Sequence, residues 1–206
     1  MEEIYPMAEE LFTLTRPSEG FFRDRGSKFY AFASPVTTLS EIEILLQTLR
    51  QQYYDARHHC YAYRLGKYGE TTFASDDGEP SHSAGAPILG AIRSFSLTNT
   101  AIVVVRYFGG TKLGVRGLIE AYRHSAEEAI RANTMVQVIP KITFAISFPY
   151  EKTSDINRIL HRFETQTVSA EYNTACHQTL SIKEADFPEL RNILEQAGFS
   201  LESVSE

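Results

Sequence analysis

A buried strand that runs into a glycine-rich loop constrains this chain more than any other stretch. Residues 101–105 (AIVVV) form an unbroken apolar run dominated by β-branched side chains, which is typical of a strand buried on both faces. Residues 106–117 (RYFGGTKLGVRG) then combine four glycines with three cations. Apolar residues recur at spacings of three and four from Leu118 to Ile130, which predicts a helix that begins near Leu118.

The glycine-rich loop is a candidate anion site. Glycine lets a backbone approach its ligand closely, and such a loop can turn several N–H groups, a helix N-terminus and a lysine toward one phosphate. The spacing matches neither the P-loop nor the dinucleotide-binding fingerprint. A structural turn that packs the helix onto a sheet is the competing interpretation, and the residues alone leave both open. The candidate binding residues are Arg106, Gly109, Gly110, Thr111, Lys112, Gly114, Arg116 and Gly117.

The composition is that of a soluble globular protein. The chain has 206 residues, of which 43% are hydrophobic and 22% are charged, and this length can bury a core without disulfides. A net charge of −6 argues against indiscriminate nucleic-acid binding, although residues 93–123 hold five cations and one acidic residue. The N-terminus lacks the apolar segment of a signal peptide, and no stretch approaches a membrane span. We therefore expect a cytoplasmic protein that does not contact a membrane.

The second half of the chain has a recognisable order of elements. The patterns predict strands at 141–148, 165–172, 175–183 and 199–204, with helices at 154–162 and 186–197. This β-α-β-β-α-β order is that of a ferredoxin-like domain. In the first half we expect strands around the polar segment 23–28 and at 58–65, and between them a helix capped by Ser40 and Glu43. The chain is therefore expected to be an α+β protein with domains at 1–136 and 137–206.

Three carboxylates, Asp76, Asp77 and Glu79, form a compact acidic segment. Carboxylates at this density can bind Mg²⁺ or Ca²⁺ or act as a general base, but Asp-Gly and Glu-Pro pairs are also common in turns. We favour the turn because the EF-hand spacing is absent, and whether a metal binds stays open. His58 and His59 point to opposite faces of their strand, so at most one can face a given site. We include the three carboxylates and His58 among the candidate binding residues, and expect no cofactor.

Three stretches carry a family resemblance: HHCYAYR at 58–64, DDGEPSHSAGAPIL at 76–89 and VVVRYFGGTKLGVRGLIEAY at 103–122. Together they resemble the YigZ/IMPACT family, and specifically its bacterial two-domain members. The resemblance covers the whole chain. It departs from the family pattern at Arg116, where a glycine is usual, and this extra cation is expected to strengthen anion binding.

The resemblance implies both a fold and a function. Residues 1–136 would form an α/β sandwich like the second domain of a small-subunit ribosomal protein, and residues 137–206 would resemble the fifth domain of elongation factor G. Eukaryotic members are translational regulators that act in the amino-acid starvation response by competing for the activator of a kinase, whereas bacterial members have no settled activity.

We therefore expect a non-catalytic regulatory protein linked to translation, which binds nucleic acid or a phosphate-bearing ligand at the glycine-rich loop. The expected partners are RNA, the ribosome or a translation-related protein. Two alternatives stay open. One is an enzyme acting on a phosphorylated or nucleotide-like small molecule, and the other is a pure protein-interaction module.

Overall fold

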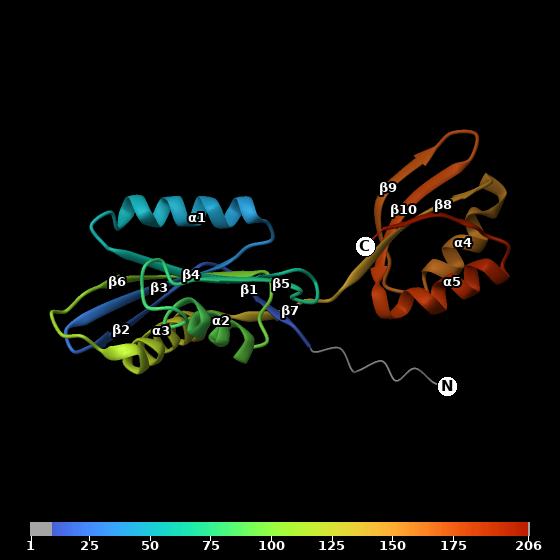
Figure 1. The fold of residues 1–206 in the computed structure, drawn as a ribbon. Helices are drawn as coiled ribbons and strands as arrows, with labels where there is room; N and C mark the ends of the chain where they lie inside the picture. The colour runs from blue at the N-terminus through green and yellow to red at the C-terminus, as the bar shows by residue number, and fades with distance from the viewer. Residues whose placement is uncertain (1–9, 206) are drawn as a thin grey trace, which may run out of the picture. The chain divides into compact units, whose positions relative to one another are not determined.

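The computed structural model describes residues 10–205 (Figure 1). The expectation about the N-terminal segment therefore concerns residues that lie largely outside this range. The chain divides into two compact units, one that extends to Val138 and one that begins at Ile139. None of the helices in the described part of the chain is both long and apolar enough to cross a membrane.

An antiparallel five-stranded sheet forms the centre of the first unit, with strand order β2-β3-β6-β4-β5. Its strands are β2 (Ser18–Asp24), β3 (Ser27–Pro35), β4 (His58–Leu65), β5 (Thr71–Ser75) and β6 (Thr100–Tyr107). The hairpin around the polar segment and the strand over 58–65 are both confirmed. The apolar run at 101–105 is the central strand β6, which is buried from Thr100 to Arg106.

Helices cover both faces of this sheet (Figure 1). Helix α1 (Leu39–Gln52) lies on one face, and helices α2 (Gly85–Ser94) and α3 (Gly114–Arg131) lie on the other. Because successive side chains of a strand alternate between faces, Val103 and Val105 pack in the α1 layer while Ile102 and Val104 pack in the α2 and α3 layer. Complete burial of each such side chain contributes about 1.5–3 kcal/mol. A separate antiparallel pair joins β1 (Phe12–Leu14) to β7 (Met135–Gln137).

Two helix starts differ from the prediction. The cap of α1 is Thr38, whose hydroxyl accepts the N–H of Glu41 at 3.3 Å, while the Glu41 carboxylate accepts the N–H of Thr38 at 3.1 Å. The prediction of Ser40 with Glu43 was wrong because both pairs have the capping-box spacing, and Thr38 is the residue with extended backbone angles. Helix α3 begins at Gly114 and not near Leu118, so its first turn contains residues that were assigned to the loop.

The second unit follows the predicted order β-α-β-β-α-β. Its elements are β8 (Lys141–Phe148), α4 (Thr153–Leu160), β9 (Gln166–Tyr172), β10 (Cys176–Lys183), α5 (Phe187–Gln196) and β11 (Leu201–Ser205), with short 3₁₀ turns at Tyr150–Lys152 and Glu184–Asp186. The sheet is antiparallel with order β11-β8-β10-β9. Its core includes Phe144, Ile146, Ile156, Leu180, Ile182 and Leu190. The α+β fold class is confirmed.

Candidate functional site

The glycine-rich loop after β6 lies directly against the turn of the β2–β3 hairpin. A Cβ atom on Gly109 would fall 1.9 Å from the carbonyl carbon of Gly26, so no other residue fits without displacing the backbone. The N–H of Gly109 donates to the hydroxyl of Ser27 at 3.1 Å. This contact brings the exposed Arg25 and Lys28 to the same end of the sheet as the loop.

Arg106 is buried at the end of β6 and is paired with an acidic residue. Its side chain is 7% exposed, and one Nη donates to a carboxylate oxygen of Glu79, whose side chain is 4% exposed. The Tyr122 hydroxyl donates to the same oxygen at 2.8 Å and is within 3.3 Å of the Cys60 thiol. Burial, together with the neighbouring Cys60 and Glu79, raises the pKa of Tyr122, so this hydroxyl stays protonated and donating. Arg106 is therefore buried and already paired with a carboxylate, and its role as a phosphate contact stays a prediction.

The guanidinium of Arg106 is nevertheless incompletely satisfied. It lies over the rings of Phe29 and Phe108, at 5.5 and 5.7 Å from their centroids. Its Nε is buried and has no hydrogen-bond partner among residues 10–205. A buried donor without a partner costs about 1–3 kcal/mol, so a ligand that supplied an acceptor here would be favoured.

Asp76 acts as the cap of α2. Its carboxylate accepts the N–H groups of His82, Ala84 and Gly85 at 2.7, 3.0 and 2.8 Å. Burial alone would raise the pKa of Asp76, but these N–H donors outweigh it and lower the pKa below its ordinary value. The carboxylate therefore replaces the hydrogen bonds that the first N–H groups of the helix cannot make within it.

Asp77 and His58 fix the acidic segment to β4. The carboxylate of Asp77 accepts the backbone N–H of His59 at 2.6 Å and lies 3.7 Å from Arg50. The ring Nδ1 of His58 is 2.8 Å from the Asp77 carbonyl oxygen. Asp76, Asp77 and Glu79 thus contact different protein groups, and within residues 10–205 no cluster of three or more His, Cys, Asp or Glu side chains could hold a metal ion. Each of the three carboxylates therefore has a partner within the protein, as expected if the acidic segment is a structural turn.

A cleft of about 380 Å³ lies between the acidic segment and the start of α3. Glu79, Arg106, Lys112 and Gly114 line it, so the structure brings these four predicted residues together. Asp76, Asp77 and His58 are not part of its lining. The remaining walls are apolar side chains that the sequence interpretation missed, namely Pro80, Phe108, Leu113, Val115 and Leu118. Two of these residues could have been recognised from the sequence. Phe108 and Val115 are large apolar residues inside a glycine-rich loop, where side chains are expected to be exposed to solvent.

The N-terminus of α3 borders this cleft without a side-chain cap. Leu113 occupies the cap position and makes no capping hydrogen bond, and the first turn contains no acidic residue. The side chain of Arg116 is 93% exposed and pairs with Glu120 at 3.1 Å. Gly109, Gly110, Thr111 and Lys112 remain in the loop, where Lys112 is exposed. The start of α3 and the cations Arg106 and Lys112 therefore lie at one cleft, whereas Arg116 is not part of its lining.

Comparison with known proteins identifies relatives along most of the chain. Residues 25–130 match the family model described as the Impact N-terminal domain. The IMPACT family member YvyE of Bacillus subtilis (strain 168) is 39% identical over 124 residues, which span 60% of this chain and 57% of that relative. The IMPACT family member YigZ of Escherichia coli (strain K12) is 28% identical over 148 residues, or 71% of this chain and 72% of the relative. A crystal structure of a hypothetical protein is similar in fold, with a TM-score of 0.70 and 24% identity over 96% of this chain and 98% of the other.

Proposed function

This chain belongs to the IMPACT family, and from that premise we propose that it is a non-catalytic regulatory protein of the cytoplasm, linked to translation, whose glycine-rich loop binds a phosphate group of its ligand. The link to translation rests on the role that the family resemblance implies for the eukaryotic members. The phosphate-binding role rests on the geometry of the cleft.

The uncapped start of α3 beside Arg106 carries this proposal. Helix α3 has 18 residues, and the N-terminus of a helix of this length has the partial positive charge that favours an anion. Arg106 is more than nine-tenths buried in the wall of the same cleft and has an unpartnered Nε within the described part of the chain. Lys112 adds an exposed ammonium group at the rim. A phosphate oxygen at this position would receive hydrogen bonds that the protein itself leaves unmade.

The contacts of the acidic segment favour binding over catalysis. A general base must have a free carboxylate oxygen within hydrogen-bond reach of the substrate. Asp76 is held by three N–H groups, and one Glu79 oxygen accepts from both Arg106 and Tyr122. An enzyme using the Asp76 carboxylate as its base would have to break those bonds first, and one using Glu79 could use only the oxygen that does not accept from Arg106 and Tyr122.

A second set of cations favours an extended ligand such as an RNA strand. The contact between Gly26 and Gly109 brings Arg25 and Lys28 to the end of the sheet that also carries Lys112. Each cation that neutralises a nucleic-acid phosphate releases a counterion, which makes affinity depend steeply on salt. Phe108 is 57% exposed between these cations and offers a ring face for a base.

Thermal melts of the full chain with phosphate, pyrophosphate, AMP and a single-stranded RNA test the proposal. A ligand at ten times its Kd should stabilise by about 1.4 kcal/mol. Lys112→Ala should leave the melting temperature without ligand unchanged, remove most of this stabilisation and lower the salt slope of RNA binding by about one unit. Lys152→Ala, in the second unit, is the matched control and should behave like the wild type. If none of the four ligands raises the melting temperature, or if Lys112→Ala responds as the wild type does, the loop does not bind phosphate.

A further inference from the structure

One polar side chain of the second unit, that of Gln178, lies at a position where the core is otherwise apolar. On β10 the residues that face the helices are Cys176, Gln178, Leu180 and Ile182, and all except Gln178 belong to the hydrophobic core. Gln178 is 9% exposed, so its amide is buried at a position between apolar neighbours. Burying an amide costs free energy unless it is hydrogen-bonded. Positions that violate a local packing rule in this way are often functional.

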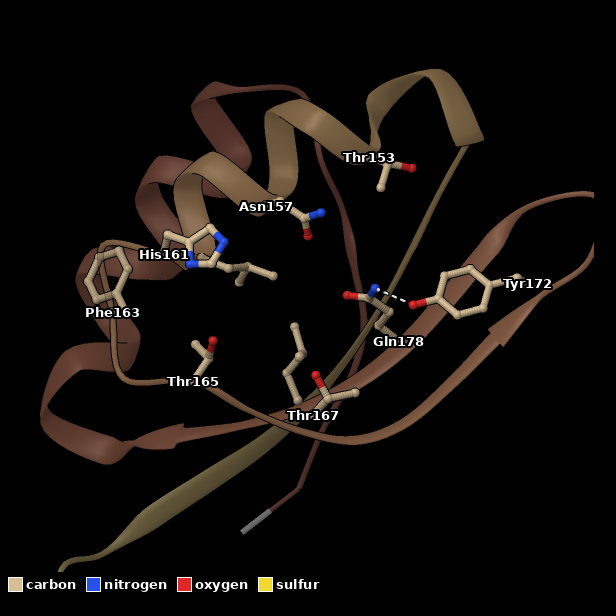
Figure 2. A pocket seen from close by; sticks show the side chains of 10 residues that line it. Thr153, Asn157, His161, Phe163, Thr165, Thr167, Tyr172 and Gln178 are labelled. Atoms are coloured by element: carbon tan, nitrogen blue, oxygen red, sulfur yellow. Dashed lines mark hydrogen bonds between the residues drawn. The ribbon is translucent and has the colours of Figure 1, made fainter.

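The Gln178 amide is only partly satisfied by the protein. Its Nε2 is 3.4 Å from the hydroxyl of Tyr172, which is a long hydrogen bond. Its carbonyl oxygen has no hydrogen-bond partner among the described residues and is not one of their buried unpartnered atoms, so it is accessible from the space that Gln178 lines. Figure 2 shows this amide directed into an open space between β10 and α4, toward the side chain of Asn157.

That space is a cleft of about 380 Å³. Thr153 and Asn157 of α4 and His161, which follows its last residue, are spaced by four and form one stripe along it, while Thr165 and Thr167 lie on the side of β9 (Figure 2). Leu160, Phe163 and Leu180 add apolar and aromatic surface. The volume lies in the range of pockets that bind small organic molecules.

Among the described residues that line it, none is Asp, Glu, Lys or Arg. A strongly charged group would enter this cleft without a counter-charge and would lose its hydration, so the cleft favours an uncharged group. It offers amides that both donate and accept, together with hydroxyl groups and aromatic rings. The group that fits must therefore have paired donors and acceptors on its edge and apolar faces.

We infer that this cleft binds a nucleobase, either as a nucleoside or as an unpaired base of an RNA strand. Asn and Gln amides present a donor and an acceptor side by side, which matches the edge of a base. Asn157 and Gln178 reach the cleft from facing elements, and Phe163 and His161 lie together at one end of it (Figure 2). Unstacked bases are recognised in this manner, by stacking on aromatic rings and by hydrogen bonds to their edges.

Titration of the full chain with the four ribonucleosides and with single-stranded RNA homopolymers tests this inference. Binding is followed by the ¹H–¹⁵N signals of the side-chain amides. Gln178→Leu replaces the amide with an apolar group of similar size, so it should preserve folding and weaken base binding at least about fivefold, which is the lower end of the roughly 1–3 kcal/mol that one amide–base pair contributes. Gln196→Leu, on the exposed side of α5, is the matched control and should bind as the wild type does.

The outcomes separate the two sources of the base. Nucleoside binding that is lost in Gln178→Leu supports the inference directly. Homopolymer binding that is lost in the same variant, with weak nucleoside binding, also supports it and identifies a strand as the source. The inference is overturned if neither class of ligand shifts the Asn157 and Gln178 amide signals, or if Gln178→Leu binds as tightly as the wild type.

Discussion

Removing the Glu79 carboxylate should destabilise the first unit strongly. Glu79 is 4% exposed and Arg106 is 7% exposed, so Glu79→Ala leaves a buried guanidinium without its counter-charge. Breaking a buried pair in this way costs about 3–5 kcal/mol. The Tyr122 hydroxyl also loses its acceptor, but this loss belongs to the same network and does not add in full. We therefore expect a decrease of about 3–5 kcal/mol in the free energy of unfolding.

A double-mutant cycle measured by urea unfolding of the full chain checks this value. The variants are Glu79→Ala, Arg106→Met and the double variant, and hydrogen exchange of the β6 amides assigns the transition to the first unit. The double variant should be more stable than the sum of the single changes predicts, with a coupling of at least about 2 kcal/mol, because it buries no unpaired charge.

Glu120→Ala is the control for this cycle, since its pair with Arg116 is exposed and should contribute little. The reasoning would be refuted by a cost below about 1 kcal/mol for Glu79→Ala, or by single changes that simply add.

Three further outcomes follow from contacts in the first unit. Asp76→Ala should cost about 1–2 kcal/mol at neutral pH. The pKa of Asp76 is lowered in the folded chain, so this contribution is present above its unfolded pKa of about 3.9 and is lost as the pH falls through its folded pKa. The urea unfolding curves of the wild type and of Asp76→Ala should therefore converge in acid. Gly109→Ala should displace the loop or unfold the unit, because its Cβ would overlap Gly26. Gly110→Ala meets open space and should cost only about 1 kcal/mol for its positive φ. Melting temperatures that fall equally in the two variants would contradict this. Residues 1–138 expressed alone should melt cooperatively, since two hydrophobic clusters lie wholly within them, and a broad, non-cooperative melt would count against two domains.

The elements of the second unit could be predicted closely from sequence because local patterns determine them. The alternation at 141–148 and the helical stripe at Ile156, Ile159 and Leu160 each match one element. The start of α3 was harder to predict, because Gly114 and Gly117 have low helix propensity and conceal its first turn. The start of α2 has no local signal, since its cap, Asp76, lies outside the helix in the preceding turn.

The residues that line the cleft between the acidic segment and the start of α3 could be predicted only in part. A loop with four glycines indicated a close approach of the backbone, and the structure has one at Gly109. The partners of the charges could not be predicted, because Glu79 is 27 residues from Arg106 and 43 residues from Tyr122. Such pairings depend on the sheet register, which no local pattern contains. The sequence therefore suggested a more exposed and more cationic site than the one observed.

The position of β6 determines the order in which the first unit can form during synthesis. The hairpins β2–β3 and β4–β5 are both complete before Thr100, but β3 and β4 pair with β6 and not with each other. Until β6 leaves the ribosome, each hairpin has an unpaired inner edge that can template association with other chains. Nascent chains halted before Thr100 are therefore expected to aggregate. Strand β6, the last strand of the five-stranded sheet to be synthesised, joins the two hairpins in a single late step.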